Sequence, residues 1–156
     1  MAKVKCRYSH CLHDSVELQK EDAICEGRKY YHKDCYQTKK DIESIVDLFL
    51  TKVNRNAPIQ QIRGIVNNIV FKRNVPSGEL LFGIRYYLKN RISLNYPQGL
   101  YYVIANKDMH KAYEAEMAKL AVKRNKKTTK VKTVESEPFV YREPDDVGLE
   151  EKWGIG

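Results

Sequence analysis

Three stretches between residues 38 and 92 repeat apolar residues at the spacing of an amphipathic helix. Within each stretch the apolar positions recur three and four residues apart, which places them on one face of a helix. The pattern predicts helices over residues 39–54, 58–72 and 77–90. Their apolar faces are expected to form one small helical core, which buries Ile45, Phe49, Ile62, Val66, Ile69, Leu81, Ile84 and Leu88.

The residues next to the second and third stretches are typical of helix starts. Pro58 suits the first turn of a helix, with Asn56 before it as a candidate cap and Ile59 as the first apolar position. Ser77 is a candidate N-cap for the third helix, and Glu79 suits the positive end of its dipole. The short connection between these two helices is compatible with a helix-turn-helix.

The pattern changes after residue 92. Residues 95–99, Asn-Tyr-Pro-Gln-Gly, are rich in turn formers, and the five residues that follow are β-prone. A short hairpin or an extended loop, packed on the helices, is therefore expected at 92–104. Asn106 then caps a last helix, whose inward positions are Met109, Tyr113, Met117 and Leu120.

The first quarter of the chain contains all four cysteines, and it predicts a metal site. In a reducing compartment, clustered cysteines beside histidines indicate metal binding rather than disulfides. His32-x-x-Cys35 is one close pair, and Cys6-x-x-x-x-Cys11 is another, twenty residues before it. Structural zinc takes four nitrogen or sulfur ligands, commonly as two such pairs. The spacing therefore predicts one zinc ion, held by Cys6, Cys11, His32 and Cys35.

Three other residues are alternative ligands, namely His10, His13 and Cys25. The Cys11 thiolate matches zinc better than His10 does, and Cys25 lies in a strand-to-turn segment where a half-buried free thiol is expected. The competing interpretation is four reduced cysteines with scattered histidines and no metal. A catalytic zinc is not favoured, because neither of the nearby carboxylates, Glu26 and Asp34, is evidently aimed at a bound water.

These observations predict a mainly α protein with a small N-terminal zinc-bound β-hairpin module, α+β overall. The module covers residues 1–37, and a helical domain with the hairpin or loop at 92–104 covers residues 38–122. Residues 123–156 are expected to be a basic linker and an acidic tail, disordered or extended in the free protein.

The net charge of +8 is unevenly distributed. Residues 111–133 contain eight basic and two acidic residues, a net +6, whereas residues 134–156 contain two basic and seven acidic residues, a net −5. The first hypothesis is therefore a zinc-containing nucleic-acid-binding or regulatory protein, in which Tyr86, Tyr87, Tyr101 and Tyr102 are candidates for base stacking. The candidate phosphate contacts are Arg63, Lys72, Arg73, Arg85, Lys89, Arg91, Lys126, Lys127, Lys130 and Lys132.

The second hypothesis is an adaptor or inhibitor that binds a host protein. Its docking segment would be the acidic tail, where Phe139, Tyr141 and Trp153 stand among acidic residues, as in segments that fold on binding. An enzyme is not favoured, because the sequence contains no phosphate-binding loop or nucleophile elbow, and His110 is expected to be isolated and solvent-facing.

The composition favours a cytoplasmic protein. No run of eighteen apolar residues is present, so no membrane span is expected. The first six residues, Met-Ala-Lys-Val-Lys-Cys, are not followed by the apolar stretch of a signal peptide.

The cysteine and histidine pattern also carries a resemblance. Cys6-x4-Cys11, followed by Gly27-Arg-Lys-Tyr-Tyr-His-Lys-Asp-Cys35, resembles the first zinc module of LIM-type and treble-clef-like fingers. Those modules usually open with Cys-x2-Cys, and Ser9 stands at the second cysteine position here. The run as far as residue 115 or so is similar to small zinc-finger proteins of bacteriophages and mobile elements of Gram-positive bacteria, through Asn67-Asn-Ile-Val-Phe71, Leu80-Leu-Phe-Gly-Ile-Arg-Tyr-Tyr87 and Leu94-Asn-Tyr-Pro-Gln-Gly-Leu-Tyr-Tyr-Val103. The resemblance implies a zinc site and a phage protein in the host cytoplasm, and it implies no mechanism.

Overall fold

The N-terminal module consists of two small antiparallel hairpins. The computed structural model describes residues 2–131, with side chains as far as residue 125. Strands β1 (Lys3–Lys5) and β2 (Glu17–Gln19) form the first hairpin, and β3 (Ile24–Glu26) and β4 (Lys29–Tyr31) form the second. A bridge between Cys6 and Tyr30 connects the two hairpins.

The tight turn of the second hairpin explains one glycine. Gly27 has φ of 55° and Arg28 has φ of 64°. Positive φ at both central residues is the type I′ geometry, whose twist matches that of the flanking strands, and glycine adopts it without steric cost. The turn directs β4 toward the start of the first helix.

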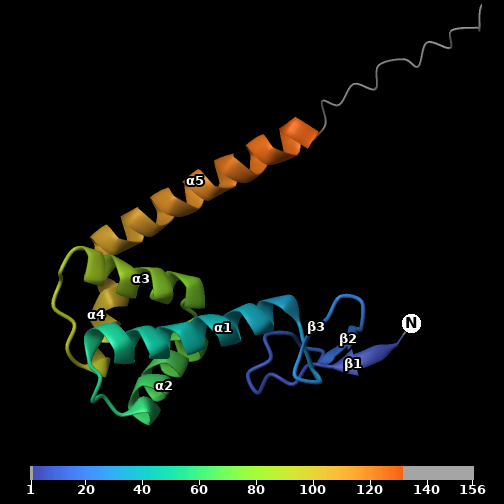
Figure 1. Ribbon diagram of the computed structural model, residues 1–156, viewed down its shortest axis with the longest axis horizontal. Helices are drawn as coiled ribbons and strands as arrows, with labels where there is room; N and C mark the ends of the chain where they lie inside the picture. Colours follow the sequence, from blue (N-terminus) through green and yellow to red (C-terminus); the bar gives the residue numbers. More distant parts are fainter. Residues whose placement is uncertain (1, 132–156) are drawn as a thin grey trace, which may run out of the picture. The chain divides into compact units, whose positions relative to one another are not determined.

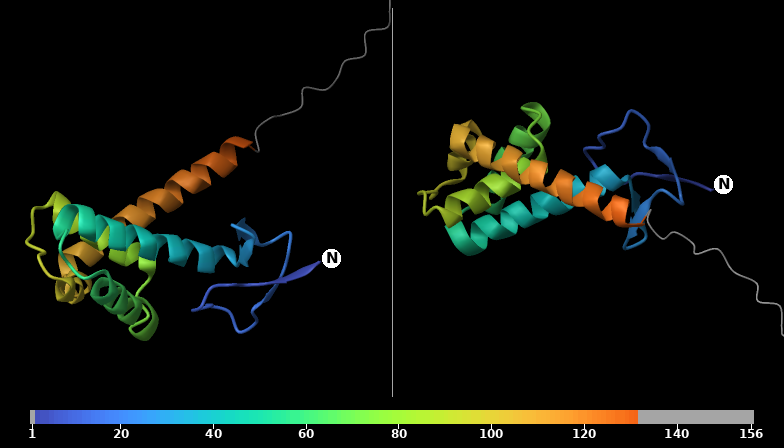
Figure 2. Two further views of the ribbon diagram at one scale, coloured as in Figure 1. Left: turned by 60° about the horizontal axis from the view of Figure 1, so that its bottom comes forward. Right: turned by 90° about the horizontal axis from the view of Figure 1, so that it is seen from above.

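Each of the three predicted helical stretches is a helix (Figure 1). Helix α1 (Lys33–Leu48) ends in a π-helical turn, η1 (Phe49–Val53), and α2 (Ile59–Asn67) ends in a second one, η2 (Asn68–Lys72). Helix α3 (Ser77–Lys89) follows. Helix α1 leads from the hairpin module into the group of helices, where it packs against both α2 and α3 (Figure 2).

The predicted helical core is confirmed, with changes at four positions. Six of the eight residues that were expected inside are buried: Ile45, Phe49, Ile62, Val66, Ile69 and Ile84. Leu81 and Leu88 are only half-buried against this core, and Leu80 is fully buried instead. Ile59 is exposed, because it begins α2 at the edge of the packed region. The fold is mainly α, as the sequence predicted.

The prediction of a hairpin or extended loop at 92–104 is wrong for most of that segment. A 3-10 turn, η3 (Pro97–Gly99), leads directly into helix α4 (Leu100–Ala105). Leu100 and Val103 are both fully buried, and their spacing of three is that of a helix face. Burial of these two side chains outweighs the β propensity of the run, which is a weak and context-dependent preference.

Two of the expected helix caps are also different. Ser77 is the first residue of α3 rather than its cap, and its hydroxyl donates a hydrogen bond of 2.7 Å to Asp41 of α1. Asn56 is not the cap of α2 either, because Pro58 occupies that position. The Ser77–Asp41 bond instead connects the start of α3 to α1.

The last helix is longer than expected and less buried. Helix α5 (Lys107–Val131) is capped by Asn106, whose Oδ1 accepts hydrogen bonds from the amides of residues 108 and 109. Met109 is fully buried, but Met117 and Leu120 are 42% and 39% exposed, so the prediction that they face inward is wrong. A compact unit ends at Ala118, and residues 119 onward belong to a second unit.

The basic stretch that was expected to be a linker is helical as far as Val131, where the description of the chain ends. The expectation that residues 123–131 are disordered or extended is therefore wrong. The acidic tail lies outside the described residues.

Candidate metal centre

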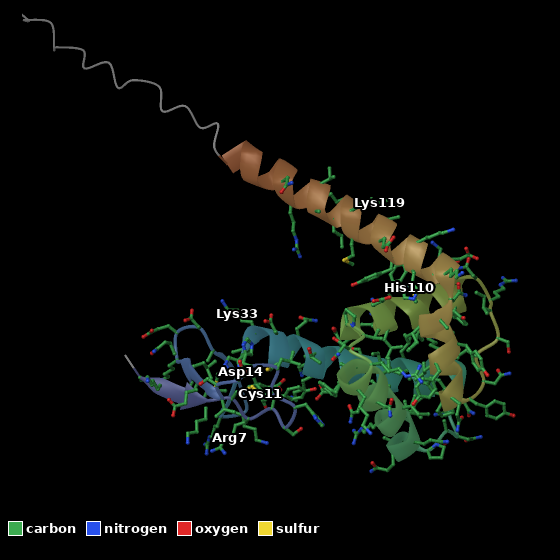
Figure 3. All side chains as sticks on the ribbon, turned by 180° about the vertical axis from the view of Figure 1, so that it is seen from behind. Arg7, Cys11, Asp14, Lys33, His110 and Lys119 are labelled. Carbon is green, nitrogen blue, oxygen red and sulfur yellow. The ribbon has the colours of Figure 1, made fainter. Side chains whose placement is uncertain are left out.

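The four predicted ligands come from two places in the module. Cys6 directly follows β1, and Cys11 lies in the loop after it. His32 is the N-cap residue of α1, and Cys35 lies in the first turn of that helix. The extended backbone of His32 and the helical backbone of Cys35 allow both side chains to turn toward Cys11, which is labelled in Figure 3.

The ligand atoms of these four residues lie within 4.8 Å of one another. The Cys11 sulfur is 3.5 Å from Nδ1 of His32 and 3.8 Å from the Cys35 sulfur, and the Cys35 sulfur is 3.8 Å from the same Nδ1. All four cysteines of the chain are free thiols. The structure therefore brings together a Cys3His cluster of the composition that binds metal ions.

The distances among Cys11, His32 and Cys35 fit tetrahedral coordination. Zinc bonds of about 2.3 Å to sulfur and about 2.0–2.1 Å to nitrogen, at tetrahedral angles, place two sulfur ligands about 3.8 Å apart and a sulfur and a nitrogen about 3.6 Å apart. The three separations given above, 3.8, 3.5 and 3.8 Å, are close to these values. Cys11, His32 and Cys35 can therefore hold a metal ion of this size without a large change in their side-chain positions, and the Cys6 sulfur lies within 4.8 Å of their ligand atoms.

Burial and the neighbouring groups shift the pKa values of the cluster residues in different directions. Burial raises the pKa of the Cys35 thiol to about 12, and Cys11 and Cys6 add to this rise. Burial also acts on Cys6, but hydrogen bonds from neighbouring backbone and thiol groups outweigh it and lower the pKa. Burial and then His13 lower the pKa of His32, which favours the neutral imidazole that binds a metal ion. A divalent cation would stabilise the three thiolates together.

A backbone hydrogen bond supports the most buried ligand. The amide of Leu12 donates to the Cys35 sulfur at 3.4 Å. Hydrogen bonds of this kind orient a metal ligand and distribute its negative charge. Since Leu12 directly follows Cys11, the same loop both supplies one ligand and positions another.

The three alternative ligands lie outside the cluster. The ring of His10 stacks on Phe71 with 4.4 Å between centroids, and Cys25 is exposed on β3 rather than half-buried. The ring of His13 packs against His32, while its Nε2 is 3.8 Å from an oxygen of Asp34. Within the described residues, no metal-binding group includes any of these three side chains.

The loop between Cys6 and Cys11 also contacts the helical core. Tyr8 and His10, both on this loop, lie against Phe71 of η2, with ring centroids 6.3 Å and 4.4 Å away. The segment between Cys6 and Cys11 therefore packs the N-terminal module against η2, at the end of α2. No local sequence signal predicts this contact, because it joins positions about sixty residues apart.

A second contact fixes the β3–β4 hairpin on α1. Glu26 forms ion pairs with Lys39 at 2.6 Å and Lys40 at 2.7 Å, and these cations lower its pKa to about 2. Tyr36 donates a hydrogen bond of 3.3 Å to the same carboxylate. Glu26 is thus a structural clamp between the hairpin and α1.

The predicted phosphate contacts in the helices are all at the surface. Arg63 lies on α2, Lys72 and Arg73 at the end of η2, and the remaining three on or just after α3; each is exposed. Among the described residues, no ion pair joins any of these six cations to a carboxylate. Lys126, Lys127 and Lys130 lie on α5, and Lys132 is outside the described residues.

The candidate stacking residues differ in their accessibility. Tyr87 is buried and donates a hydrogen bond to the carbonyl of Tyr102, so it cannot stack on a base. Tyr102 is 74% exposed, and Tyr96, which the sequence analysis did not single out, is 70% exposed. The Arg73 guanidinium lies over the ring of Tyr101 at 4.5 Å.

The α2–α3 pair lacks the close mutual packing of a helix-turn-helix. Helix α3 packs mainly against α1 and α4, and its contact with α2 is slight. Any nucleic-acid contact of these helices therefore has to come from their exposed charges rather than from that motif.

The sequence predicted that His110 is isolated, but in the structure its ring contacts two other residues. Its Nδ1 is 2.5 Å from a carboxylate oxygen of Glu79, and its Nε2 is 2.6 Å from the carbonyl oxygen of residue 104. These contacts connect the start of α5 to α3 and to the end of α4, which is a structural role.

Comparisons with known proteins identify no relative of this chain. No family model, no curated protein and no solved structure matches the chain at a significant level. Within residues 2–131, no helix has both the length and the apolar character that crossing a membrane requires. The resemblance to phage zinc-finger proteins stays a prediction.

Proposed function

We propose that this chain is a zinc-stabilised protein that binds nucleic acid in a regulatory role. The observation that carries the zinc assignment is the Cys3His cluster, whose ligand atoms lie within 4.8 Å of one another, with Cys11, His32 and Cys35 at separations close to tetrahedral values. Three thiols and one imidazole are ligands that suit zinc. A phage origin, which the resemblance implies, is part of the proposal.

The role of the zinc is structural. Four protein ligands complete a tetrahedral shell and leave no open position for a substrate. The two carboxylates that lie close to the ligands in sequence have other partners, since Glu26 binds lysines of α1 and Asp34 lies beside His13. Bound zinc would tie β1, the loop after it and the first turn of α1 into one unit, and this loop holds the module against Phe71.

The exposed cations support nucleic acid as the partner. Six arginines and lysines of the helical region are exposed and have no carboxylate partner in the described part of the chain. Lys39 and Lys40, by contrast, have their charge neutralised by Glu26 and Glu43. Unneutralised surface cations are the groups that release counterions from a phosphate backbone.

The test measures binding of the zinc-loaded full chain to a fluorescent random-sequence DNA duplex, with a single-stranded RNA of equal length in parallel. Affinity should decrease with salt with a log-log slope of about −0.9 for each phosphate neutralised on duplex DNA. Replacing Arg85 and Lys89 with Gln should make that slope less steep. The matched control replaces Lys39 and Lys40, whose charges are already neutralised, and should change the slope little.

Deletion of residues 134–156, with a net −5, should raise the affinity if these acids compete with phosphate. Absence of DNA and RNA binding at low salt, in the full-length and the shortened chain alike, would refute this function.

One observation favours the alternative, a host-protein adaptor or inhibitor. Met117 and Leu120 are 42% and 39% exposed, and their spacing of three places them on the same side of α5, where an apolar pair can contact a protein partner. A stable complex with a host protein that survives nuclease treatment, together with no nucleic-acid affinity, would select this alternative. Loss of the complex on deletion of residues 134–156 would identify the acidic tail as its docking segment.

A further inference from the structure

The second half of α5 is the most basic element of the structure. Between Met117 and Val131 the helix contains six lysines and arginines and no acidic residue. Lys119, labelled in Figure 3, lies about halfway along this helix. A regular helix fixes the angular positions of these cations, which a flexible linker does not.

The helical period places four of the six cations in one row. At about 100° per residue, positions 123, 126 and 130 fall about +40°, −20° and +20° from position 119 around the helix axis. The four lysines at 119, 123, 126 and 130 thus share a sector about 60° wide. With a rise of about 1.5 Å per residue, the row is about 16 Å long.

We propose that this row of lysines is a binding face for the phosphate backbone of duplex nucleic acid. This inference rests on the proposed function. It places the phosphate contact on one face of α5 and adds Lys119 and Lys123 to the candidate contacts. A row of positive charge without an intervening acid follows a line of phosphates, and the contact carries no sequence information. An α-helix fits the major groove of DNA, where such a row meets the backbone at the groove edge.

The apolar residues of the same segment argue against a membrane surface. A helix that binds a membrane places its apolar residues on one face. Here Met117, Leu120 and Val122 lie at about 160°, 100° and 300° from Lys119, so they are distributed around the helix. The lysines form a narrow face, whereas the apolar residues do not.

The experiment compares two triple variants of the zinc-loaded full chain with equal charge. The first replaces Lys119, Lys123 and Lys126 with Gln, and all three belong to the row. The control replaces Lys107, Lys111 and Arg124 with Gln, which remove the same charge from other faces of α5. Glutamine is a good helix former, so both variants should retain the helix, which circular dichroism at 222 nm checks.

Binding to a 20-base-pair random DNA duplex is measured from low to moderate salt. The row variant should make the log-log salt slope less steep by about 2.7, or about 0.9 for each lost phosphate contact, and the control should change it by less than one contact. Equal changes in the two variants would overturn the proposal, because charge alone would then explain binding. If the unmodified chain binds DNA and neither variant changes the salt slope, the proposal is also overturned, but the proposed function is left intact. No binding by the unmodified chain would refute both.

Two further measurements test the helix and the ligand class. Ala121→Pro preserves every charge but breaks the helix within the row, so it should weaken DNA binding by a factor similar to that of the row variant. Unchanged binding by Ala121→Pro would show that the row does not act as a rigid face. Vesicles of anionic phospholipid should bind less tightly than the duplex at equal charge. A preference for the vesicles, lost in the row variant, would assign the face to a membrane and overturn the proposal.

Discussion

Replacement of Gly83 with Ala tests the packing of α3 against α4 and α5. A Cβ atom at this position would lie 2.5 Å from Cγ1 of Val103 and 3.4 Å from the sulfur of Met109. Met109 can adjust, but Val103 is fully buried and its branched side chain has one strongly preferred rotamer in a helix. Overpacking of this kind costs about 1–3 kcal/mol. Alanine gains up to about 1 kcal/mol in helix propensity over glycine, so a net loss of up to about 2 kcal/mol remains.

Gly64 provides the matched control on α2. A Cβ atom there meets no other atom within 4 Å, so Gly64→Ala receives the propensity gain without the clash. This variant should be more stable than the original chain by about 0.5–1 kcal/mol.

Urea unfolding of the zinc-loaded protein, followed at 222 nm, gives both free energies of unfolding if the m-value is unchanged. Gly83→Ala and Gly64→Ala should therefore move the midpoint in opposite directions. A stabilising Gly83→Ala would refute the close approach of α3 to Val103.

Three other predictions concern single contacts. Ser77→Ala removes the hydrogen bond to the Asp41 carboxylate and should lower the free energy of unfolding by about 1.5–3 kcal/mol in urea titrations. Asn106→Ala removes the cap of α5 and should lower the free energy of unfolding by about 1 kcal/mol in the same assay. An unchanged free energy of unfolding would contradict this capping role. Lysines of α1 lower the pKa of Glu26 from 4.5 to about 2, so its clamp stabilises the fold above pH 4.5 and loses this effect as the pH falls toward 2. The difference in melting temperature between the unmodified chain and Glu26→Gln should accordingly shrink over that interval, and a constant difference would show that Glu26 acts without its charge.

The helices could be predicted from sequence because each has a one-sided apolar pattern. Phe49, Ile62 and Ile84 recur at helical spacing in segments long enough for the period to be clear, and all three are fully buried. The short helix α4 could not be identified in this way. It spans six residues, and its β-prone composition is overridden by burial of Leu100 and Val103, which depends on the other helices.

The length of α5 was underestimated for a related reason. Beyond residue 120 this helix has no apolar face, so the periodic signal used to find the other helices is absent there. Lysine and arginine are nonetheless good helix formers, and no proline or glycine interrupts the segment as far as Val131. The composition of residues 121–131 therefore could have predicted the helix there, where apolar periodicity is absent.

The candidate metal cluster was the most predictable part of the site. Metal ligands occur in close sequence pairs with characteristic spacing, so local sequence carries the information. The parts that hold the module in place were not visible in the sequence. The Glu26 clamp on Lys39 and Lys40, and the stacking of His10 on Phe71, join residues whose proximity only the fold determines.

Zinc held by these four ligands is the central claim, and metal analysis of the purified chain tests it most directly. Native mass spectrometry, with elemental analysis to identify the metal, should find one zinc ion per chain. Cys35→Ser should lose the metal and unfold the module, since formation of such a site is coupled to folding. Cys25→Ser, which changes an exposed thiol outside the cluster, should retain one zinc ion. A metal-free unmodified chain prepared with zinc present, or equal metal loss in the two variants, would contradict the account.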